Sequence, residues 1–306
     1  MTARFPVSDY DLAATLDSGQ VFRWQRSGES WEGVVGSDWF QLRSVPGFLE
    51  AASGRPDARW DRLRDFLGLE DPLGYICGTF PQDPPMQAAL SACPGLRLLR
   101  QDPWECLASF LLSSTKQIVQ IRQCVDLLCR RFGEPVAVPS GCPPAHRFPD
   151  PERLAQAGEA ALRECKLGFR ARYLAGTALR ISEATLDLES LQDRPTAEVR
   201  EALMSLPGVG RKIADCVLLF AYRRQEAFPV DVWILRALRG LYFPNRRPKL
   251  RTLMRFAETH FGPHAGYAQQ YLFHHVRTHL GRAAFAKPKR GRFRNVLTSL
   301  KPHGSH

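Results

Sequence analysis

The chain has 306 residues, 44% of them hydrophobic, and a formal net charge of +11 at pH 7. No run of about 18 uncharged apolar residues occurs, which argues against a membrane-spanning helix, and the N-terminus has no apolar block, which argues against a secretory signal. The excess of cations favours a polyanionic partner, most commonly nucleic acid. We therefore expect a cytoplasmic or nucleoid-associated protein if the source is bacterial and a nuclear one if it is eukaryotic.

Residues 1–98 are predicted to form an N-terminal domain with an antiparallel sheet and flanking helices. The segment VFRWQRSGESWEGVVGSDWFQLRS, residues 21–44, alternates apolar or aromatic with polar residues, as half-buried strands do. Its SGES and GSD turns favour an antiparallel meander. From ARWDRLRDFLGL, residues 58–69, the hydrophobic period becomes helical.

Residues 99–281 are predicted to form a helical body. Apolar residues recur at three- and four-residue spacing over several turns between residues 102 and 133. A proline-rich loop is expected over Val138–Pro151, followed by a new helix. Residues 282–306 are basic and contain no acidic residue, so we expect a flexible tail. The predicted fold class is α+β, mostly helical.

A helix-hairpin-helix motif is predicted around Leu206–Phe220, LPGVGRKIADCVLLF. Gly208 and Gly210 allow the backbone to bend sharply and to approach another surface. The free N–H groups at the start of the second helix would then suit a phosphate. The same local pattern also fits a plain packing corner between two helices.

A lysine and an aspartate are the candidate catalytic residues. Lys212 lies in the first turn of the second helix, and Asp231 follows nineteen residues later in FPVDVWI. A neutral lysine amine is a nucleophile that forms Schiff bases, and a buried carboxylate opposite it would assist. The alternatives are a solvated lysine and an aspartate that only caps the next helix.

Five collinear segments resemble the 8-oxoguanine DNA glycosylases of the helix-hairpin-helix superfamily. They are SGQVFRW (Ser18–Trp24), LRQDPWECLASFLLSS (Leu99–Ser114), LGFRARYL (Leu167–Leu174), LPGVGRKIADCVLLFA with FPVDVWI, and GPHAGYAQQYLF (Gly262–Phe273). The resemblance implies a bifunctional DNA glycosylase/AP lyase that acts on 8-oxoguanine in duplex DNA. Lys212 would attack the sugar C1′ and form an imine, and β-elimination would then nick the strand. Asp231 would stabilise the oxocarbenium-like charge.

The resemblance also assigns the residues of a base pocket. The flipped base would lie between Cys216 and Phe273, and Gln269 would contact its Watson–Crick edge. The carbonyl of Gly19 would accept a hydrogen bond from N7–H, which 8-oxoguanine has and guanine lacks. Without the resemblance, Phe273 fits a core position, Gln269 a surface position and Gly19 an ordinary turn.

The remaining candidate residues would contact DNA. Phe169 would insert into the base stack and Arg170 would face the opposite base, or else Arg170 is simply solvated at a helix end. Two sites depart from the family pattern. Thr115, Lys116 and Gln117 replace an asparagine-rich run, which puts strict preference for an opposite cytosine in doubt. Trp233 replaces a histidine that contacts phosphate, so an altered phosphate contact is expected there. The hairpin amides of Gly208, Gly210 and Lys212 would bind phosphate.

No cofactor is expected to be required, although hairpin carbonyls can hold a monovalent cation in this superfamily. The eight cysteines show no metal-site spacing, and reduced thiols are expected. No cysteine follows Cys216, so the sequence lacks the ligands of the iron–sulfur cluster that adenine-removing and endonuclease III-like relatives carry.

The predicted partner is double-stranded DNA containing 8-oxoguanine, bound by a monomer. Competing interpretations are a glycosylase of the same superfamily for another damaged base and a non-catalytic helix-hairpin-helix DNA-binding module. The second needs neither Lys212 nor Asp231.

Overall fold

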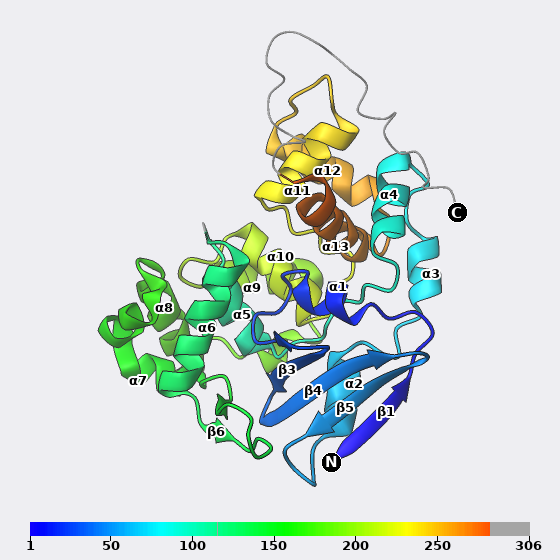
Figure 1. The fold of residues 1–306 in the computed structure, drawn as a ribbon. Helices are drawn as coiled ribbons and strands as arrows, with labels where there is room; N and C mark the ends of the chain where they lie inside the picture. Colours follow the sequence, from blue (N-terminus) through cyan, green and yellow to red (C-terminus); the bar gives the residue numbers. More distant parts are fainter. Residues whose placement is uncertain (115, 282–306) are drawn as a thin grey trace.

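The computed structural model describes residues 1–114 and 116–281. An antiparallel sheet lies at one end of the molecule, and helices build the rest of it (Figure 1). This arrangement confirms the predicted α+β, mostly helical class. Thr115 and the basic segment 282–306 lie outside the described residues.

Within residues 1–114 and 116–281, the sheet has five antiparallel strands in the order β1-β5-β4-β3-β2. They are β1 (Thr2–Pro6), β2 (Gln25–Ser27), β3 (Ser30–Val35), β4 (Asp38–Val45) and β5 (Phe48–Ser53). Leu42 of β4 lies opposite Trp31 on one side and Ala51 on the other, and all three side chains are buried. Because side chains alternate between the two faces of a strand, this row covers one face of the sheet with apolar groups.

Helices follow the sheet in sequence, and one precedes β2. They are α1 (Leu12–Asp17), α2 (Trp60–Phe66), α3 (Leu73–Gly78), α4 (Pro84–Ala92), α5 (Pro103–Leu111), α6 (Ile118–Phe132), α7 (Pro151–Leu162), α8 (Arg170–Ser182), α9 (Thr196–Met204), α10 (Arg211–Phe220), α11 (Val232–Ala237), α12 (Leu250–His260) and α13 (Ala265–His275). A π-helical turn, η4 (Val276–Leu280), continues α13. A short pair of strands, which the sequence did not indicate, joins residues just before the proline-rich loop to the loop itself: β6 (Pro135–Val136) and β7 (Ala145–His146). None of the described helices is both long and apolar enough to cross a bilayer.

The described part of the chain has two apolar core clusters. The smaller cluster joins the sheet to α1 and α2. The larger one runs through the helical body and includes apolar side chains of α3 and α4, such as Ile76 and Met86. Figure 1 shows α3 and α4 beside α13. The boundary at residue 98 stays a prediction, although residues 73–98 share their core with the helical body.

Ion pairs connect the sheet region to the helical body. Arg100 pairs with Asp65 at 2.5 Å and also with Asp71. Asp65 in turn pairs with Arg223, at 2.6 Å, and Asp71 accepts a hydrogen bond from the hydroxyl of Tyr267 at 2.9 Å. These contacts join residues far apart in the chain, so they tie α2 and the segment after it to the helical body.

Candidate active site

The helix-hairpin-helix motif is formed by α9, residues 205–210 and α10. Gly208 has φ +77°, and a Cβ added there would lie 2.6 Å from Cγ of Tyr173 on α8. Only glycine combines this backbone conformation with such a close approach. Thr177 of α8 also contacts the hairpin, since its hydroxyl donates to the carbonyl of Pro207 at 3.3 Å. The predicted hairpin is therefore present, with a rigid support that the sequence did not reveal.

The outer side of the hairpin presents backbone N–H groups. Gly208 and Gly210 are exposed, and Gly210 caps α10 without a side-chain hydrogen bond. Within the described residues no acceptor is found for the amides of Gly208, Gly210 and Lys212. Open amides at a helix N-terminus form an anion site, so the structure keeps these three groups available, and their role in phosphate binding stays a prediction.

Lys212 is half-buried, and its amine is held by the end of α5. Its Nζ donates to Oγ of Ser113 at 3.0 Å and lies 4.9 Å from the centre of the Phe110 ring. The Ser113 hydroxyl donates to the carbonyl of Phe110 at 2.6 Å, which orients its oxygen as an acceptor for the amine. Sequence reasoning assigned no role to Ser113 or Phe110, although both lie in the quoted segment that ends in LLSS.

Asp231 caps the N-terminus of α11. Its Oδ1 accepts a hydrogen bond from the amide of Ile234 at 2.8 Å, so the capping role considered from sequence is confirmed. Burial raises the pKa of this carboxyl, whereas the hydrogen bond from Ile234 and the positive charge of Lys212 act in the opposite direction. The cap therefore leaves the carboxylate within electrostatic reach of the Lys212 amine.

Cys216 lies one turn after Lys212 on α10 and is buried. Burial raises the pKa of its thiol to about 11, and the neighbouring Lys212 lowers it in part. The side chain is thus a neutral, polarisable surface at neutral pH, suited to packing against a ring.

We expect the Cys216 thiol to resist alkylation in the folded protein. With a pKa of about 11, only about one part in a thousand is thiolate at pH 8, and the thiolate is the reactive form. Iodoacetamide labelling followed by peptide mass spectrometry measures this, and the rate should rise with pH up to about 11. Cys142, which is half-buried in the proline-rich loop, serves as the control. Equal labelling of Cys142 and Cys216 at pH 8 would contradict the prediction.

The structure brings Gly19 and Phe273 together. A Cβ added at Gly19 would lie 3.5 Å from Cε1 of Phe273 and 2.6 Å from Cδ1 of Ile118. Gln269 is 4% exposed, and among the described residues its Oε1 has no hydrogen-bond partner. Buried polar atoms nearly always have a partner, so this oxygen is suited to an external donor. The assignment of these residues to a base pocket stays a prediction.

Phe169 and Arg170 differ in exposure. The Phe169 side chain is 48% exposed, as a residue that inserts into DNA needs to be. Arg170 is only 5% exposed, and its guanidinium lies 4.3 Å from the Phe169 ring centre and donates to the carbonyls of Leu167 and Ser114. In this structure Arg170 supports Phe169 and the segment after α5, so facing an opposite base would require it to leave these partners.

The other predicted DNA contacts lie at helix starts. Lys116 donates to the carbonyl of Lys166 at 3.1 Å, and Gln117 forms a capping box with Gln120 at the start of α6. Trp233 lies in the first turn of α11, 5.8 Å from the Arg236 guanidinium. Thr115 lies outside the described residues. The contacts described at these positions are all within the protein, so binding of DNA by these residues stays a prediction.

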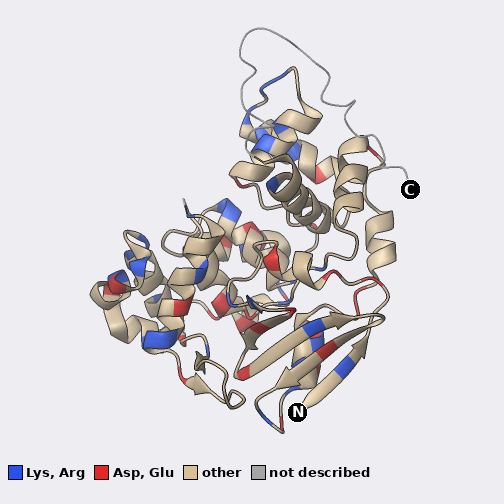
Figure 2. Cartoon of the chain, viewed as in Figure 1, with Lys and Arg blue, Asp and Glu red and all other residues tan. Residues whose placement is uncertain are grey.

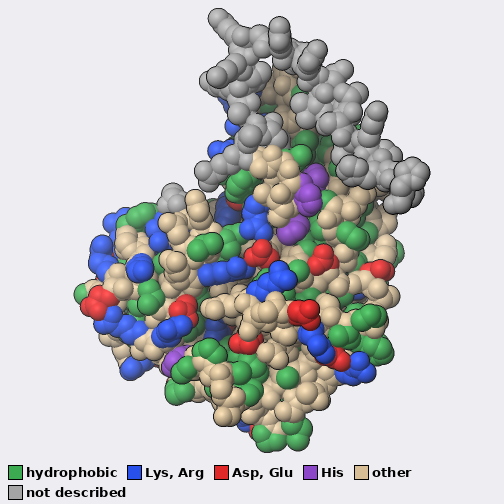
Figure 3. All heavy atoms as spheres, in the orientation of Figure 1, with side chains coloured by type: hydrophobic (Ala, Val, Ile, Leu, Met, Phe, Trp, Pro, Cys, Tyr) green, Lys and Arg blue, Asp and Glu red, His purple; other side chains and the backbone are tan. Residues whose placement is uncertain are grey.

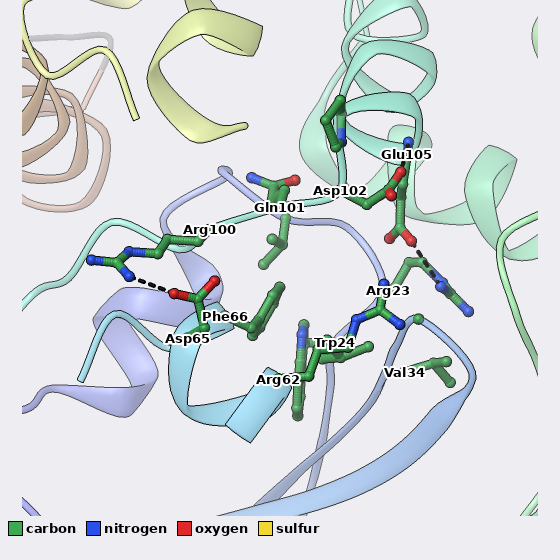
Figure 4. A pocket seen from close by; sticks show the side chains of 14 residues that line it. Arg23, Trp24, Val34, Arg62, Asp65, Phe66, Arg100, Gln101, Asp102 and Glu105 are labelled. Carbon is green, nitrogen blue, oxygen red and sulfur yellow. Dashed lines mark hydrogen bonds and ion pairs between the residues drawn. The ribbon is translucent and has the colours of Figure 1, made fainter. Parts of the chain in front are cut away.

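A pocket of about 240 Å³ lies elsewhere, between the sheet and the start of α5 (Figure 4). Its ion pairs, Arg23 with Glu105 at 3.1 Å and Arg100 with Asp65, are drawn in Figure 4. Of the candidate residues that the structure describes, none lines this pocket. The candidate residues of the predicted active site and base pocket lie instead on α10, α11, α13 and the turn after α1.

Two family models match successive parts of the chain. Residues 108–263 match the HhH-GPD superfamily of base excision DNA repair proteins. Residues 3–107 match the N-terminal domain of 8-oxoguanine DNA glycosylase. The chain therefore belongs to the 8-oxoguanine DNA glycosylase branch of the helix-hairpin-helix superfamily, as its motifs predicted.

Full-length relatives agree with this assignment. A protein of Methanothermobacter thermautotrophicus named "Probable N-glycosylase/DNA lyase" is 32% identical, over 90% of this chain and 96% of its own length. The Arabidopsis thaliana N-glycosylase/DNA lyase OGG1 is 33% identical, over 87% of this chain and 77% of its own. The Clostridium acetobutylicum 8-oxoguanine glycosylase/lyase, solved with DNA containing cytosine opposite 8-oxoguanine, superposes with a TM-score of 0.82 at 30% identity, covering 88% of this chain and 92% of that one.

Proposed function

We propose that the protein is a bifunctional DNA glycosylase/AP lyase that excises 8-oxoguanine from duplex DNA. The observation that carries this proposal is the placement of the Lys212 amine. Ser113 and Phe110 hold it within electrostatic reach of the half-buried carboxylate of Asp231, in the first turn after a hairpin with open amides. A non-catalytic DNA-binding module would have no use for this arrangement.

The proposed reaction has two covalent steps. The Lys212 ammonium first loses a proton to solvent. The neutral amine then attacks C1′, the N-glycosidic bond breaks, and the base leaves with the bonding electron pair and takes up a proton. Loss of a proton from the resulting nitrogen, with opening of the sugar ring, gives an imine. Removal of a C2′ proton then breaks the C3′–O bond and releases the strand. Asp231 assists by stabilising the positive charge that develops at C1′.

Three features support binding of the DNA backbone by the hairpin side of the molecule. The open amides of the hairpin suit a phosphate. Arg211, the first residue of α10, pairs with Glu258 of α12 at 3.1 Å, which joins α12 to the hairpin. Lys and Arg gather on α12 and the loop before it, where Arg251 and Arg255 are exposed (Figure 2).

On the face in Figure 3 acidic side chains are interspersed with basic ones, so net charge alone does not define the DNA-binding surface.

We propose that no cofactor is required. Among the described residues no group of three or more His, Cys, Asp or Glu side chains could hold a metal ion. A monovalent cation at the hairpin carbonyls remains part of the proposal, and comparison of DNA affinity in potassium and in tetramethylammonium chloride at equal ionic strength tests it. We also propose a monomer in the cytoplasm or nucleoid, or in the nucleus of a eukaryote.

Borohydride trapping tests the proposed function. The wild-type protein is incubated with duplexes that carry 8-oxoguanine opposite each of the four bases, reduced, and resolved by denaturing electrophoresis. We expect a covalent protein–DNA adduct and a nicked strand, with undamaged duplex as the negative control. The pattern over the four duplexes measures the opposite-base preference.

The same assay separates the competing interpretations. Release of 8-oxoguanine without an adduct would indicate a monofunctional enzyme. DNA binding with neither release nor adduct would overturn the proposal in favour of another lesion or of a binding module.

A further inference from the structure

The turn that carries Gly19 has an uneven pattern of backbone hydrogen bonds. We call residues 17–20 the reading loop. The carbonyl of Asp17 accepts from Arg277, that of Ser18 from Nε2 of Gln270 at 3.1 Å, and that of Gln20 from Nε2 of Gln101 at 2.7 Å. Within the described residues the Gly19 carbonyl has no donor. Three side chains therefore occupy the carbonyls around Gly19 and leave one acceptor open.

One face of α13 and η4 makes three of the contacts to the reading loop. Gln270, Phe273 and Arg277 are spaced i, i+3 and i+7, which places them along one side of a helix. Gln270 binds Ser18, the Phe273 ring packs on the α-carbon side of Gly19, and Arg277 binds Asp17. The Arg277 guanidinium also lies 5.9 Å from the centre of the Phe273 ring. The residues before Gly19 are thus held from the helix that supplies the predicted pocket wall.

The reading loop is held from α6 as well. Arg122 pairs with the Asp17 carboxylate at 2.8 Å, and Ile118, one turn earlier, leaves no room for a side chain at Gly19. The Gln20 side chain is buried and donates to the carbonyls of Thr15 and Arg97 at 2.9 and 2.8 Å. This clamping is independent of the hairpin, Lys212 and Asp231.

We propose that Gln270 and Arg277 are positioning residues that hold the Gly19 carbonyl for recognition of the N7–H of 8-oxoguanine. The inference rests on the proposed function and deepens it. A single hydrogen bond to N7–H distinguishes the damaged base from guanine only if the acceptor is fixed within about 0.5 Å, because a loose carbonyl could move to tolerate the lone pair of guanine. Neither side chain touches the base or the sugar in this role.

A comparison of two reactions on matched duplexes tests the proposal. One duplex carries 8-oxoguanine opposite the preferred base, and the other carries a preformed abasic site at the same position. In Gln270→Met the side chain keeps its length and loses its donor. We expect single-turnover excision of 8-oxoguanine to fall about tenfold, and strand cleavage at the abasic site to stay within about twofold, since no base is read there. Arg277→Met should show the same split, and Gln87→Met, an exposed glutamine on α4, should show none.

The pH dependence of the two activities in Gln270→Glu separates a positioning role from a purely structural one, because a purely structural role would not change this dependence. An ionised carboxylate cannot donate to the Ser18 carbonyl, whereas a protonated carboxyl can. The ratio of 8-oxoguanine excision to abasic-site cleavage in this variant, divided by the wild-type ratio at the same pH, should therefore rise as pH is lowered.

The outcomes separate this inference from the proposed function. Equal losses of both activities in Gln270→Met, or no loss in either, together with a pH profile of Gln270→Glu that follows the wild-type profile, would overturn the positioning role while leaving the proposed function intact. Failure of the wild type to release 8-oxoguanine would overturn both.

Discussion

Replacing Lys212 with glutamine should abolish both strand cleavage and borohydride trapping, and lower excision of 8-oxoguanine by at least about 10³-fold. Glutamine retains a polar side chain that can donate to Ser113 Oγ, but its amide nitrogen is not a nucleophile. Without the amine, only water can attack C1′, and no imine can form. Single-turnover excision with 8-oxoguanine duplex and trapping under identical conditions measure the two losses.

The matched control for this experiment is Lys249→Gln. Lys249 is an exposed lysine at the start of α12 with no side-chain cap bond, so its replacement removes the same charge without removing the proposed nucleophile. Binding of Lys212→Gln to 8-oxoguanine duplex should stay within about tenfold of wild type, as one lost cation contact allows. A trapped adduct that persists in Lys212→Gln would assign the nucleophile to another amine and contradict the mechanism.

Replacing Asp231 with asparagine should separate its structural role from its chemical one. Asparagine is as good an N-cap as aspartate, and its side-chain oxygen can still accept from the Ile234 amide. The negative charge that stabilises the developing cation at C1′ is lost, so we expect excision to fall by about 10²–10³-fold. Asp231→Ala should lose the cap in addition, and about 1 kcal/mol of stability.

The pH dependence of unfolding tests whether the charge of Asp231 contributes to stability. Burial raises the pKa of Asp231, so the folded chain holds this proton more tightly than the unfolded chain does. The stabilisation due to this proton is present below the unfolded pKa and is lost as pH rises through the folded pKa. At neutral pH, Asp231→Asn should therefore be at least as stable as wild type in thermal unfolding. A marked fall in its Tm would show that the carboxylate charge itself supports α11, and excision within about threefold of wild type would remove Asp231 from the proposed mechanism.

Local features of the active site could be predicted because their causes are local. Proline and glycine restrict or extend the backbone angles of the hairpin within a few residues of Gly208. Pro229 disfavours helix just before Asp231, and an aspartate at that position caps the helix that follows. The strands were predictable for the same reason, since alternation over residues 21–44 is a property of consecutive residues.

Contacts between distant segments could not be predicted from those patterns. Ser113 holds the Lys212 amine across 99 residues of sequence, and Gln270 reaches Ser18 across 252. A serine after a helix and a glutamine inside one have no local signature for either role. The burial of Arg170 could likewise not be predicted, because the Ser114 carbonyl that it binds becomes its neighbour only when α8 packs on α5.

The sequence by itself determined the class of fold, the family, the hairpin and the helix positions of Lys212 and Asp231. These features depend on backbone preferences and on short-range periodicity, and both are set by a small number of neighbouring residues. Only the tertiary structure decided which groups surround the amine, which carbonyl of the reading loop stays open, and which helices share a core with α3 and α4. Those outcomes depend on how the apolar faces of remote helices pack, and that packing alone brings residues far apart in the chain to within hydrogen-bond distance.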